Sequence, residues 1–305
     1  MKAEEMGLRA LGWTVRYGEL VNCLSESLER RGVKIFRPAN VKYAHRSAVE
    51  SLEVLELEDG TEFTVGLRVD AEGGLYGEAG ERDQVVDYGQ WALVSEVVLN
   101  VEPGLLSGSN TLAFERFTSE GPLALLPIST DQRKYSLVWC APLETVQRRL
   151  ACTDEDFSRE LRQQFGRRIS IEHIGPRKSF PLGMNWRDKL VQGRRVAIGN
   201  AAQILHPVAG QGLNLGLRDA MQLCRSIDPS TVAVEHRLST ALHDFEKSRV
   251  ADRQVVVKMT DWMVKGFSNH NPLLGAGRQM ALNVMEFTPP LRKQFAELML
   301  FGLAV

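Results

Sequence analysis

The chain has 305 residues, of which 44% are hydrophobic and 25% charged, and its formal net charge is −1. This composition indicates a globular protein with enough apolar residues for one large or two smaller domains. The balanced charge excludes the clustered basic surface that nucleic-acid-binding proteins present.

Two further features limit where the protein acts. The four cysteines, Cys23, Cys140, Cys152 and Cys224, are scattered and lack the spacing of a zinc site, so we expect buried thiols and no metal. No targeting segment follows Met1, and no run of about 18 apolar residues occurs. We therefore expect a cytoplasmic protein that is neither secreted nor membrane-spanning.

The first part of the chain predicts a helix followed by short strands. Apolar residues recur at helical spacing over residues 17–31, and Gly32 is a typical helix stop. Asp59-Gly60, between two alternating runs, is a strong hairpin signal. Runs with strand character are found at residues 33–36, 41–46, 51–58, 61–65 and 67–71.

The middle of the chain predicts an antiparallel sheet. Strand-like runs separated by Pro and Gly turns fill residues 85–101 and 112–142. A helix is expected at residues 154–165, and residues 170–180 return to the sheet. These elements would form a lobe of their own.

The most informative stretch lies at residues 194–220. A short apolar strand at residues 196–198 ends at Gly199-Asn200, and a loop punctuated by Pro207, Gly210 and Gly212 follows. A helix is expected to begin near Gly212, because apolar residues then recur at helical spacing. These residues are Leu213, Leu217, Ala220, Met221 and Cys224.

A glycine-rich turn that opens a helix can bind an anion or a carbonyl oxygen. It presents backbone N–H groups without partners and the positive end of the helix dipole. A lone Gly-x-Gly pair is nevertheless more often a simple turn. His206, in the same loop, could steer a phenol or could simply be hydrogen-bonded, and we assign it no catalytic role.

Helices are expected in the remainder of the chain, at residues 234–267, 273–287 and 291–303. Arg249 is expected on the polar side of the first of them. Its apolar side is expected to carry Leu238, Leu242, Phe245, Val250, Val257, Thr260, Met263 and Val264. The apolar stretch at residues 296–305 is expected to seal the protein's own core, and docking on a membrane or a partner is the alternative.

Residues 199–220 read Gly-Asn-Ala-Ala-Gln-x-x-His-Pro-x-x-Gly-Gln-Gly-x-Asn-x-Gly-x-x-Asp-Ala. This pattern resembles the second flavin-binding signature of the para-hydroxybenzoate-hydroxylase-like FAD monooxygenases, and in particular the ubiquinone-biosynthesis hydroxylases of the UbiH/VisC type. Residues 71–73 and 117–127 also resemble that family. The resemblance implies that FAD is bound by Gly199, Asn200, Ala201, Pro207, Gly210, Gln211, Gly212, Leu213 and Asn214.

The resemblance also implies individual roles. Asn200 would contact the ribityl chain, Pro207 would lie beside the ring, and N–H groups near Gly212 would bind the flavin carbonyl. The family usually has Asp at the position of Asn200, and an amide can hydrogen-bond but brings no charge. Substrate contacts would come from Phe117, Leu126 and Pro127, which could instead pack on the core of their own sheet.

The implied fold is of the α+β or α/β class: an incomplete GR2-type FAD-binding domain, an inserted antiparallel-sheet substrate domain and C-terminal helices. Residues 1–84 would form part of the FAD-binding domain, residues 85–185 the substrate domain, and residues 186–305 the second half of the FAD-binding domain with the closing helices. The family's front strand, Gly-x-Gly-x-x-Gly turn and helix have no counterpart in this sequence.

The implied activity is FAD-dependent hydroxylation of a polyprenylated phenol in ubiquinone biosynthesis, with dioxygen as cosubstrate, flavin hydroperoxide as oxygen donor and NAD(P)H as reductant. The C-terminal helix could give peripheral contact with the inner membrane. The alternative is a flavin-free binding or scaffolding protein of the ubiquinone-biosynthesis complex. The length of the loop match favours the enzyme, whereas the missing front unit, Asn200 and Glu72 favour the alternative.

Overall fold

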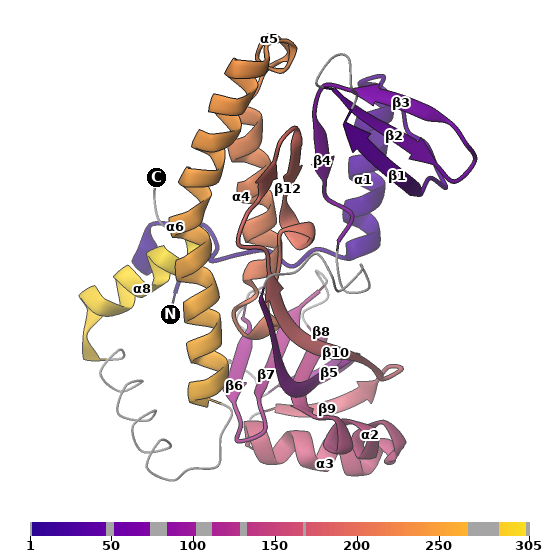
Figure 1. Cartoon of the computed structure of the whole chain (residues 1–305). Helices are drawn as coiled ribbons and strands as arrows, with labels where there is room; N and C mark the ends of the chain where they lie inside the picture. Colours follow the sequence, from indigo (N-terminus) through magenta and orange to yellow (C-terminus); the bar gives the residue numbers. More distant parts are fainter. Residues whose placement is uncertain are drawn as a thin grey trace. The chain divides into compact units, whose positions relative to one another are not determined.

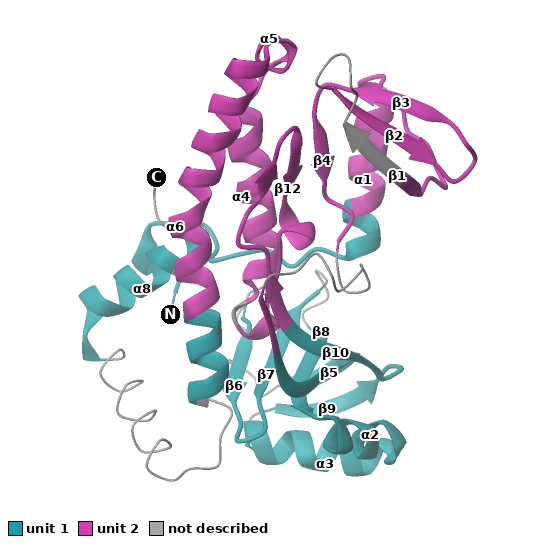
Figure 2. Ribbon diagram, in the orientation of Figure 1, with its two compact units in different colours: residues 1–20, 87–183, 259–302 teal, residues 21–86, 184–258, 303–305 magenta. Residues whose placement is uncertain are grey.

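Figure 1 shows the computed structural model, which describes residues 2–46, 52–73, 84–101, 112–128, 133–166, 169–267 and 287–302. The chain forms two compact units (Figure 2). Unit 1 contains Met1–Leu20, Asp87–Gly183 and Met259–Gly302, and unit 2 contains Val21–Val86, Met184–Lys258 and Leu303–Val305. The mixture of helices and antiparallel sheet confirms the predicted fold class. The bounds of the three domains inferred from the sequence stay a prediction.

Unit 1 is built on an antiparallel sheet. Its central strand, β5 (Gln84–Val101), pairs with β8 (Lys134–Pro142) and, further along, with β9 (Ile169–Ile174). The sheet continues from β8 through β7 (Pro122–Pro127) to β6 (Phe114–Phe117), and β10 (Lys178–Trp186) lies on the other side of β5. The predicted sheet is thus confirmed.

Two helices cover one face of this sheet, α2 (Leu143–Ala151) and α3 (Asp154–Phe165) (Figure 1). The predicted helix at residues 154–165 is confirmed, and the Thr153 side chain caps it by accepting a hydrogen bond from the Asp156 N–H. The short helix α2 is not predicted from the sequence. The core beneath both helices includes Leu93, Val97, Leu99, Leu123, Leu125, Tyr135, Leu137 and Trp139.

Unit 2 contains a small antiparallel sheet made of β1 (Val41–Arg46), β2 (Glu53–Leu57) and β3 (Glu62–Val65). The predicted hairpin is confirmed, because Gly60 adopts φ 81° and the Asp59 carboxylate accepts the Thr61 N–H at 2.9 Å. Helix α1 (Tyr17–Arg30) ends just before Gly32, as predicted.

The predicted strand at residues 33–36 is wrong. These residues form no strand in the described structure. The ring of Phe36 instead lies against the ring of Phe63, with the two centroids 4.9 Å apart. An apolar run can therefore anchor a side chain without finding a strand partner.

The second sheet of unit 2 leads into the stretch singled out by the sequence. Strand β4 (Arg68–Asp70) runs parallel to β12 (Arg195–Ala197), which pairs antiparallel with β11 (Val191–Gln192). Both longer strands lie where the sequence predicts them. The surrounding core consists of Leu190, Val196, Ala197, Ala201, Ala202, Leu223, Leu238, Leu242 and Phe245.

The later helices are α4 (Gln211–Ser226), α5 (Pro229–Ala233), α6 (Glu235–Phe267) and α8 (Pro289–Phe301). Helix α8 begins at its two prolines rather than after them, because the first helical N–H groups have no intrahelical acceptor to lose. The helix expected at residues 273–287 lies outside the described residues, apart from Phe287. In the described ranges, no helix is long and apolar enough to cross a bilayer.

Most of the predicted buried face of α6 is confirmed, because Val257, Thr260, Met263 and Val264 are also buried, but the middle of the helix differs. Leu238, Leu242 and Phe245 are buried as expected, but Val250 is 36% exposed. The buried side continues instead through Arg249 and through Asp252 and Arg253. The sequence predicts Arg249 on the polar side of the helix, because a charged residue is normally exposed.

Candidate functional site

The segment between β12 and α4 forms a compact turn in unit 2. It contains the short helix η3 (Gly199–Ala201), strand β13 (Gln203–Ile204) and the short helix η4 (Pro207–Ala209). Gly199 and Gly210 adopt φ values of 58° and 59°, a left-handed conformation that favours glycine. The predicted order of strand, loop and helix is confirmed, with the helix starting at Gln211.

Three glycines of this segment have different surroundings. A Cβ added to Gly216 would lie 3.2 Å from the Cα of Gly199, so the turn packs directly on α4 at this point. A Cβ added to Gly212 would meet no atom within 4 Å. Gly216 is therefore in tight contact with the turn, whereas a side chain at Gly212, in the first turn of α4, would enter open space.

The N-terminus of α4 can accept a negatively charged or carbonyl group. Gly210 is the N-cap residue and offers no side-chain acceptor, and the first turn contains no acidic residue. The first N–H groups of a helix have no intrahelical partner, and those of Gly212 and Leu213 belong to this set. A 16-residue helix adds the positive end of its dipole.

The nine residues that the sequence predicts for cofactor binding all lie in unit 2, in the turn after β12 and the first residues of α4. Two are buried, Ala201 and Gln211, and Gly199 and Gly212 are half-buried. The exposed ones are Asn200, Pro207, Gly210, Leu213 and Asn214. The exposed residues can be reached by a ligand, whereas the two buried ones face the protein interior.

A buried acidic residue supports the turn from α4. Asp219 is fully buried, and its Oδ2 accepts hydrogen bonds from the Gly199 N–H at 3.1 Å and the Gln203 Nε2 at 2.7 Å. Its Oδ1 accepts a bond from the Arg249 Nε at 2.8 Å. This role of Asp219 is not predicted from the sequence, although the residue lies inside the motif, because its partner on α6 is distant along the chain.

His206 acts as a cap within the loop. Its Nδ1 accepts a hydrogen bond from the Val208 N–H at 3.2 Å, and its side chain is buried. Burial lowers the pKa of His206 to about 4, so the imidazole is neutral at pH 7. This geometry supports a structural role for His206.

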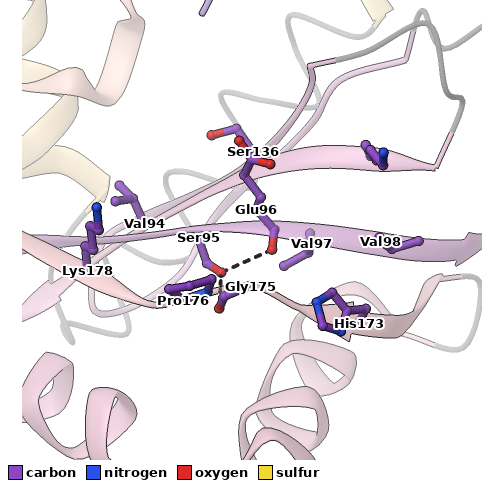
Figure 3. Close-up of a pocket in the computed structure, with 11 residues that line it drawn as sticks. Val94, Ser95, Glu96, Val97, Val98, Ser136, His173, Gly175, Pro176 and Lys178 are labelled. Carbon is purple, nitrogen blue, oxygen red and sulfur yellow. Dashed lines mark hydrogen bonds between the residues drawn. The ribbon is translucent and has the colours of Figure 1, made fainter. Parts of the chain in front are cut away.

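Unit 1 contains a separate cavity of about 530 Å³ (Figure 3). Residues of β5, β8, β9 and β10 line it, among them Glu96, Ser136 and Lys178. Ser95 Oγ donates a hydrogen bond to the Gly175 carbonyl oxygen at 2.9 Å at its edge. The lining mixes apolar, hydroxyl and charged groups, so it can receive a ligand that has both apolar and polar parts.

The strand register relates this cavity to the residues predicted for substrate binding. Leu126 pairs with Ser136, which in turn pairs with Glu96, so the three side chains share one face of the sheet. Phe117 pairs with Pro122 and faces the same side. Pro127 pairs with the buried core residue Tyr135 and therefore faces the opposite side. Of these three residues, only Phe117 and Leu126 therefore lie on the same face of the sheet as Ser136 and Glu96.

In the part of the chain that the structure describes, no three His, Cys, Asp or Glu side chains gather as metal ligands.

Comparison with known sequences gives a family and several relatives. The profile of the FAD binding domain family matches residues 15–259. A ubiquinone hydroxylase, UbiL, of Rhodospirillum rubrum is 32% identical over 244 residues, which are 78% of this chain and 55% of the relative. The 3-demethoxyubiquinol 3-hydroxylase of Escherichia coli is 28% identical over 300 residues, which are 96% of this chain and 73% of the relative. The chain thus spans about half the length of the first of these relatives.

Solved structures show a similar fold. A probable FAD-dependent monooxygenase, PqsL, from Pseudomonas aeruginosa superposes with a TM-score of 0.65 at 19% identity, covering 85% of this chain and 71% of that chain. The flavin-dependent brominase Bmp2 gives a TM-score of 0.67 at 17% identity, covering 94% of this chain and 70% of that chain. At these identities the similarity concerns the fold alone.

Proposed function

Because this chain belongs to the FAD binding domain family, we propose that the turn and helix start at residues 199–214 hold the flavin part of FAD. The observation that carries this proposal is the open space at Gly212, in front of the N-terminus of α4. A flat ring can approach the backbone there because no Cβ intervenes. This unobstructed stretch of backbone supports the proposed flavin site.

The individual contacts follow from exposure. The N–H groups of Gly212 and Leu213 would donate to a flavin carbonyl oxygen, and the exposed Asn214 would add a side-chain amide. The exposed Asn200 would hydrogen-bond a ribityl hydroxyl, and Pro207 would lie beside the ring. Gly199 and Gly210 would supply the left-handed backbone that these contacts need.

Ala201 and Gln211 would contribute in a different way. Both are buried, so their part would be to support the backbone of the turn from inside. The predicted set of nine residues would then divide into residues that touch the cofactor and residues that hold the turn in shape.

We infer that the reaction is hydroxylation of a polyprenylated phenol in ubiquinone biosynthesis. The names of the Rhodospirillum rubrum and Escherichia coli relatives support this substrate class. Bound FAD would supply the oxygen-activating chemistry, with dioxygen as cosubstrate and NADPH or NADH as reductant. The protein's own residues would orient the ring and exclude water.

The sheet face of unit 1 offers contacts for such a substrate. Leu126 and Phe117 would provide apolar surface, and Ser136 and Glu96 on the same face would provide hydrogen-bonding groups. Pro127, on the opposite face, would support the strand instead. A phenol with an apolar tail combines the two kinds of surface that this face presents.

We further propose that helix α8 gives the protein a peripheral contact with the inner membrane or with other proteins of ubiquinone biosynthesis. Leu291 is 43% exposed and Phe301 is 54% exposed on this helix. Apolar side chains of this kind are suited to a lipid surface or to a protein partner.

The absorption and fluorescence of the purified protein, recorded with and without added FAD, test the flavin proposal. We expect the protein to bind FAD and the Gly212→Leu variant to lose binding, because the new side chain fills the open space. Met221→Ala, an exposed change further along the same helix, is the matched control and should bind FAD as the original protein does.

Two outcomes would contradict the proposal. Unchanged binding by Gly212→Leu would place the flavin elsewhere. A protein that neither carries nor takes up FAD would favour the alternative function, a flavin-free binding or scaffolding protein of the same pathway. Asn200 favours that alternative because its side chain brings no charge to the turn.

A further inference from the structure

We propose that Arg249 and Arg253, one turn apart on α6, are positioning residues that fix the shape of the turn at residues 199–203. This inference rests on the proposed function, since the flavin is proposed to bind at the same turn. Both guanidinium groups are buried and act on the turn through two intermediate side chains, Asp219 and Gln203.

Arg249 acts through Asp219. Its Nε donates to Asp219 Oδ1 at 2.8 Å, and the other oxygen of the same carboxylate accepts the Gly199 N–H at 3.1 Å. Asp219 is fully buried, so these bonds are charge-assisted and lie in a low-dielectric environment. The orientation of the carboxylate, and with it the first residue of the turn, therefore depends on Arg249.

Arg253 acts through Gln203. The Gln203 Nε2 donates to Asp219 at 2.7 Å, and its Oε1 accepts a bond from the Arg253 Nε at 2.7 Å. The carboxamide of Gln203 is thus hydrogen-bonded at both ends. Its orientation is fixed by the carboxylate of Asp219 on one side and the guanidinium of Arg253 on the other. Gln203 is the last residue of the turn.

A second nitrogen of Arg253 extends the support to the middle of the turn. Its Nη2 donates to the Arg187 carbonyl oxygen at 2.8 Å. Arg187 then donates from its backbone N–H to the Ala202 carbonyl oxygen and from its Nε to the Ala201 carbonyl oxygen, both at 2.9 Å. The exposed residue of this supported turn is Asn200.

The charges of the cluster explain why it is sensitive to geometry. Arg249 Nη2 also lies 2.8 Å from Asp252 Oδ2, and Asp252 Oδ1 lies 2.8 Å from Arg218 Nη1 on α4. Positively and negatively charged side chains therefore alternate between the two helices. Buried charges are tolerated only when their partners are well placed, and loss of one partner leaves the other charge uncompensated. The cluster therefore favours one arrangement of the turn.

Lysine cannot replace arginine in this arrangement. The planar guanidinium of Arg253 presents Nε and Nη2 in fixed directions, toward Gln203 and toward Arg187. An ammonium keeps the charge but is a single point on a flexible stem. Arg249→Lys and Arg253→Lys thus remove the geometry while retaining the charge.

The test is amide hydrogen exchange in the flavin-free protein, followed by titration with FAD. In Arg249→Lys and Arg253→Lys, we expect exchange at residues 199–204 to be about tenfold to a hundredfold faster, the effect of losing a hydrogen bond to a charged group. Exchange in β8 should be unchanged, and FAD affinity should fall by a similar factor. Arg237→Lys, an exposed change on the same helix, is the control and should alter neither quantity.

Two results would overturn the proposal: unchanged exchange at the turn in both variants, or an equal rise in β8. Faster exchange at the turn with unchanged FAD affinity would instead contradict the flavin site proposed for this turn. If one variant does not fold, the other still decides, because each acts through a different side chain. If the original protein binds no FAD, the proposed function fails, whereas the exchange measurement still decides whether the arginines position the turn.

Discussion

Gly199 and Gly216 approach each other so closely that a Cβ on Gly216 would lie 3.2 Å from the Cα of Gly199. The contact joins the start of the turn to the second turn of α4. A backbone atom cannot move aside as a flexible side chain can, so this distance limits what the helix may carry at position 216.

The first prediction concerns this contact. Gly216→Ala should be less stable than Gly212→Ala by about 1–3 kcal/mol, the usual cost of overpacking. Both variants exchange a helical glycine for alanine, so the comparison reduces the effect of helix propensity. Denaturant unfolding measures the difference, and equal stability of the two variants would show that the turn can shift away from α4.

The second prediction concerns His206. Burial lowers its pKa to about 4 in the folded protein from the usual 6.5, so the unfolded chain binds more protons between these pH values. Stability should therefore fall as the pH falls from about 6.5 to 4, by roughly 3 kcal/mol from this group. The imidazole NMR signals of His206 should stay in their neutral positions at pH 5.

The His206→Asn variant provides the matched comparison. Asparagine can still accept the Val208 N–H but does not titrate, so the variant should lack this part of the pH dependence. A His206 signal that titrates between pH 6 and 7 would contradict the buried, neutral assignment.

The third prediction concerns Glu160 in unit 1. Its hydrogen bonds from Arg148 and Arg149 lower the pKa of Glu160 to about 2, from the usual 4.5. The stabilisation should be present above about pH 4.5 and be lost as the pH falls toward 2. Glu160→Gln should therefore be less stable than the original protein at pH 6 and equally stable near pH 2.

Urea unfolding at a series of pH values measures this difference. Glu155→Gln, an exposed change on the same helix, is the control and should leave stability within about 0.5 kcal/mol at each pH. A constant gap between Glu160→Gln and the original protein down to pH 2 would disprove the predicted window.

The fourth prediction concerns the two sides of α4. Leu217 and Met221 are each 58% exposed, whereas Leu215 is fully buried. Leu217→Gln or Met221→Gln should change the free energy of unfolding by no more than about 0.5 kcal/mol. Leu215→Ala should lower the free energy of unfolding by about 2–5 kcal/mol. A loss smaller than that of the glutamine variants would show that the buried and exposed sides of α4 are assigned the wrong way round.

The same helix shows which parts of the fold can be predicted from sequence. The periodicity of Leu213, Leu217 and Met221 correctly predicts a helix, yet these residues are exposed. The buried side carries Asp219 between Leu215 and Leu223. Periodicity identifies a helix from local spacing, but the buried side of α4 depends on the segments that pack against it, among them Arg249 of α6.

Local signals account for the other successes. The hairpin at Asp59-Gly60 and the helix capped by Thr153 depend on neighbouring residues and were predicted with nearly correct bounds. The failed strand at residues 33–36 depends on pairing with a distant segment, which an apolar run does not specify.

The glycines and the positions of the candidate cofactor residues could likewise be predicted, because they belong to one continuous motif. The arginines on α6 could not, since a single sequence does not show that a charged residue faces the interior. Their role becomes visible only when Asp219 and Gln203 are seen between α6 and the turn.

The support of the turn also has a consequence for the order of events during synthesis. Gln203 leaves the ribosome 50 residues before Arg253, which holds its carboxamide oxygen. During that interval strand β12 and the hairpin at Asp59-Gly60 can form from nearby residues, but the turn at residues 199–203 lacks one of the groups that fix its shape. The segment proposed to bind the cofactor therefore reaches its final conformation only after α6 has been synthesised.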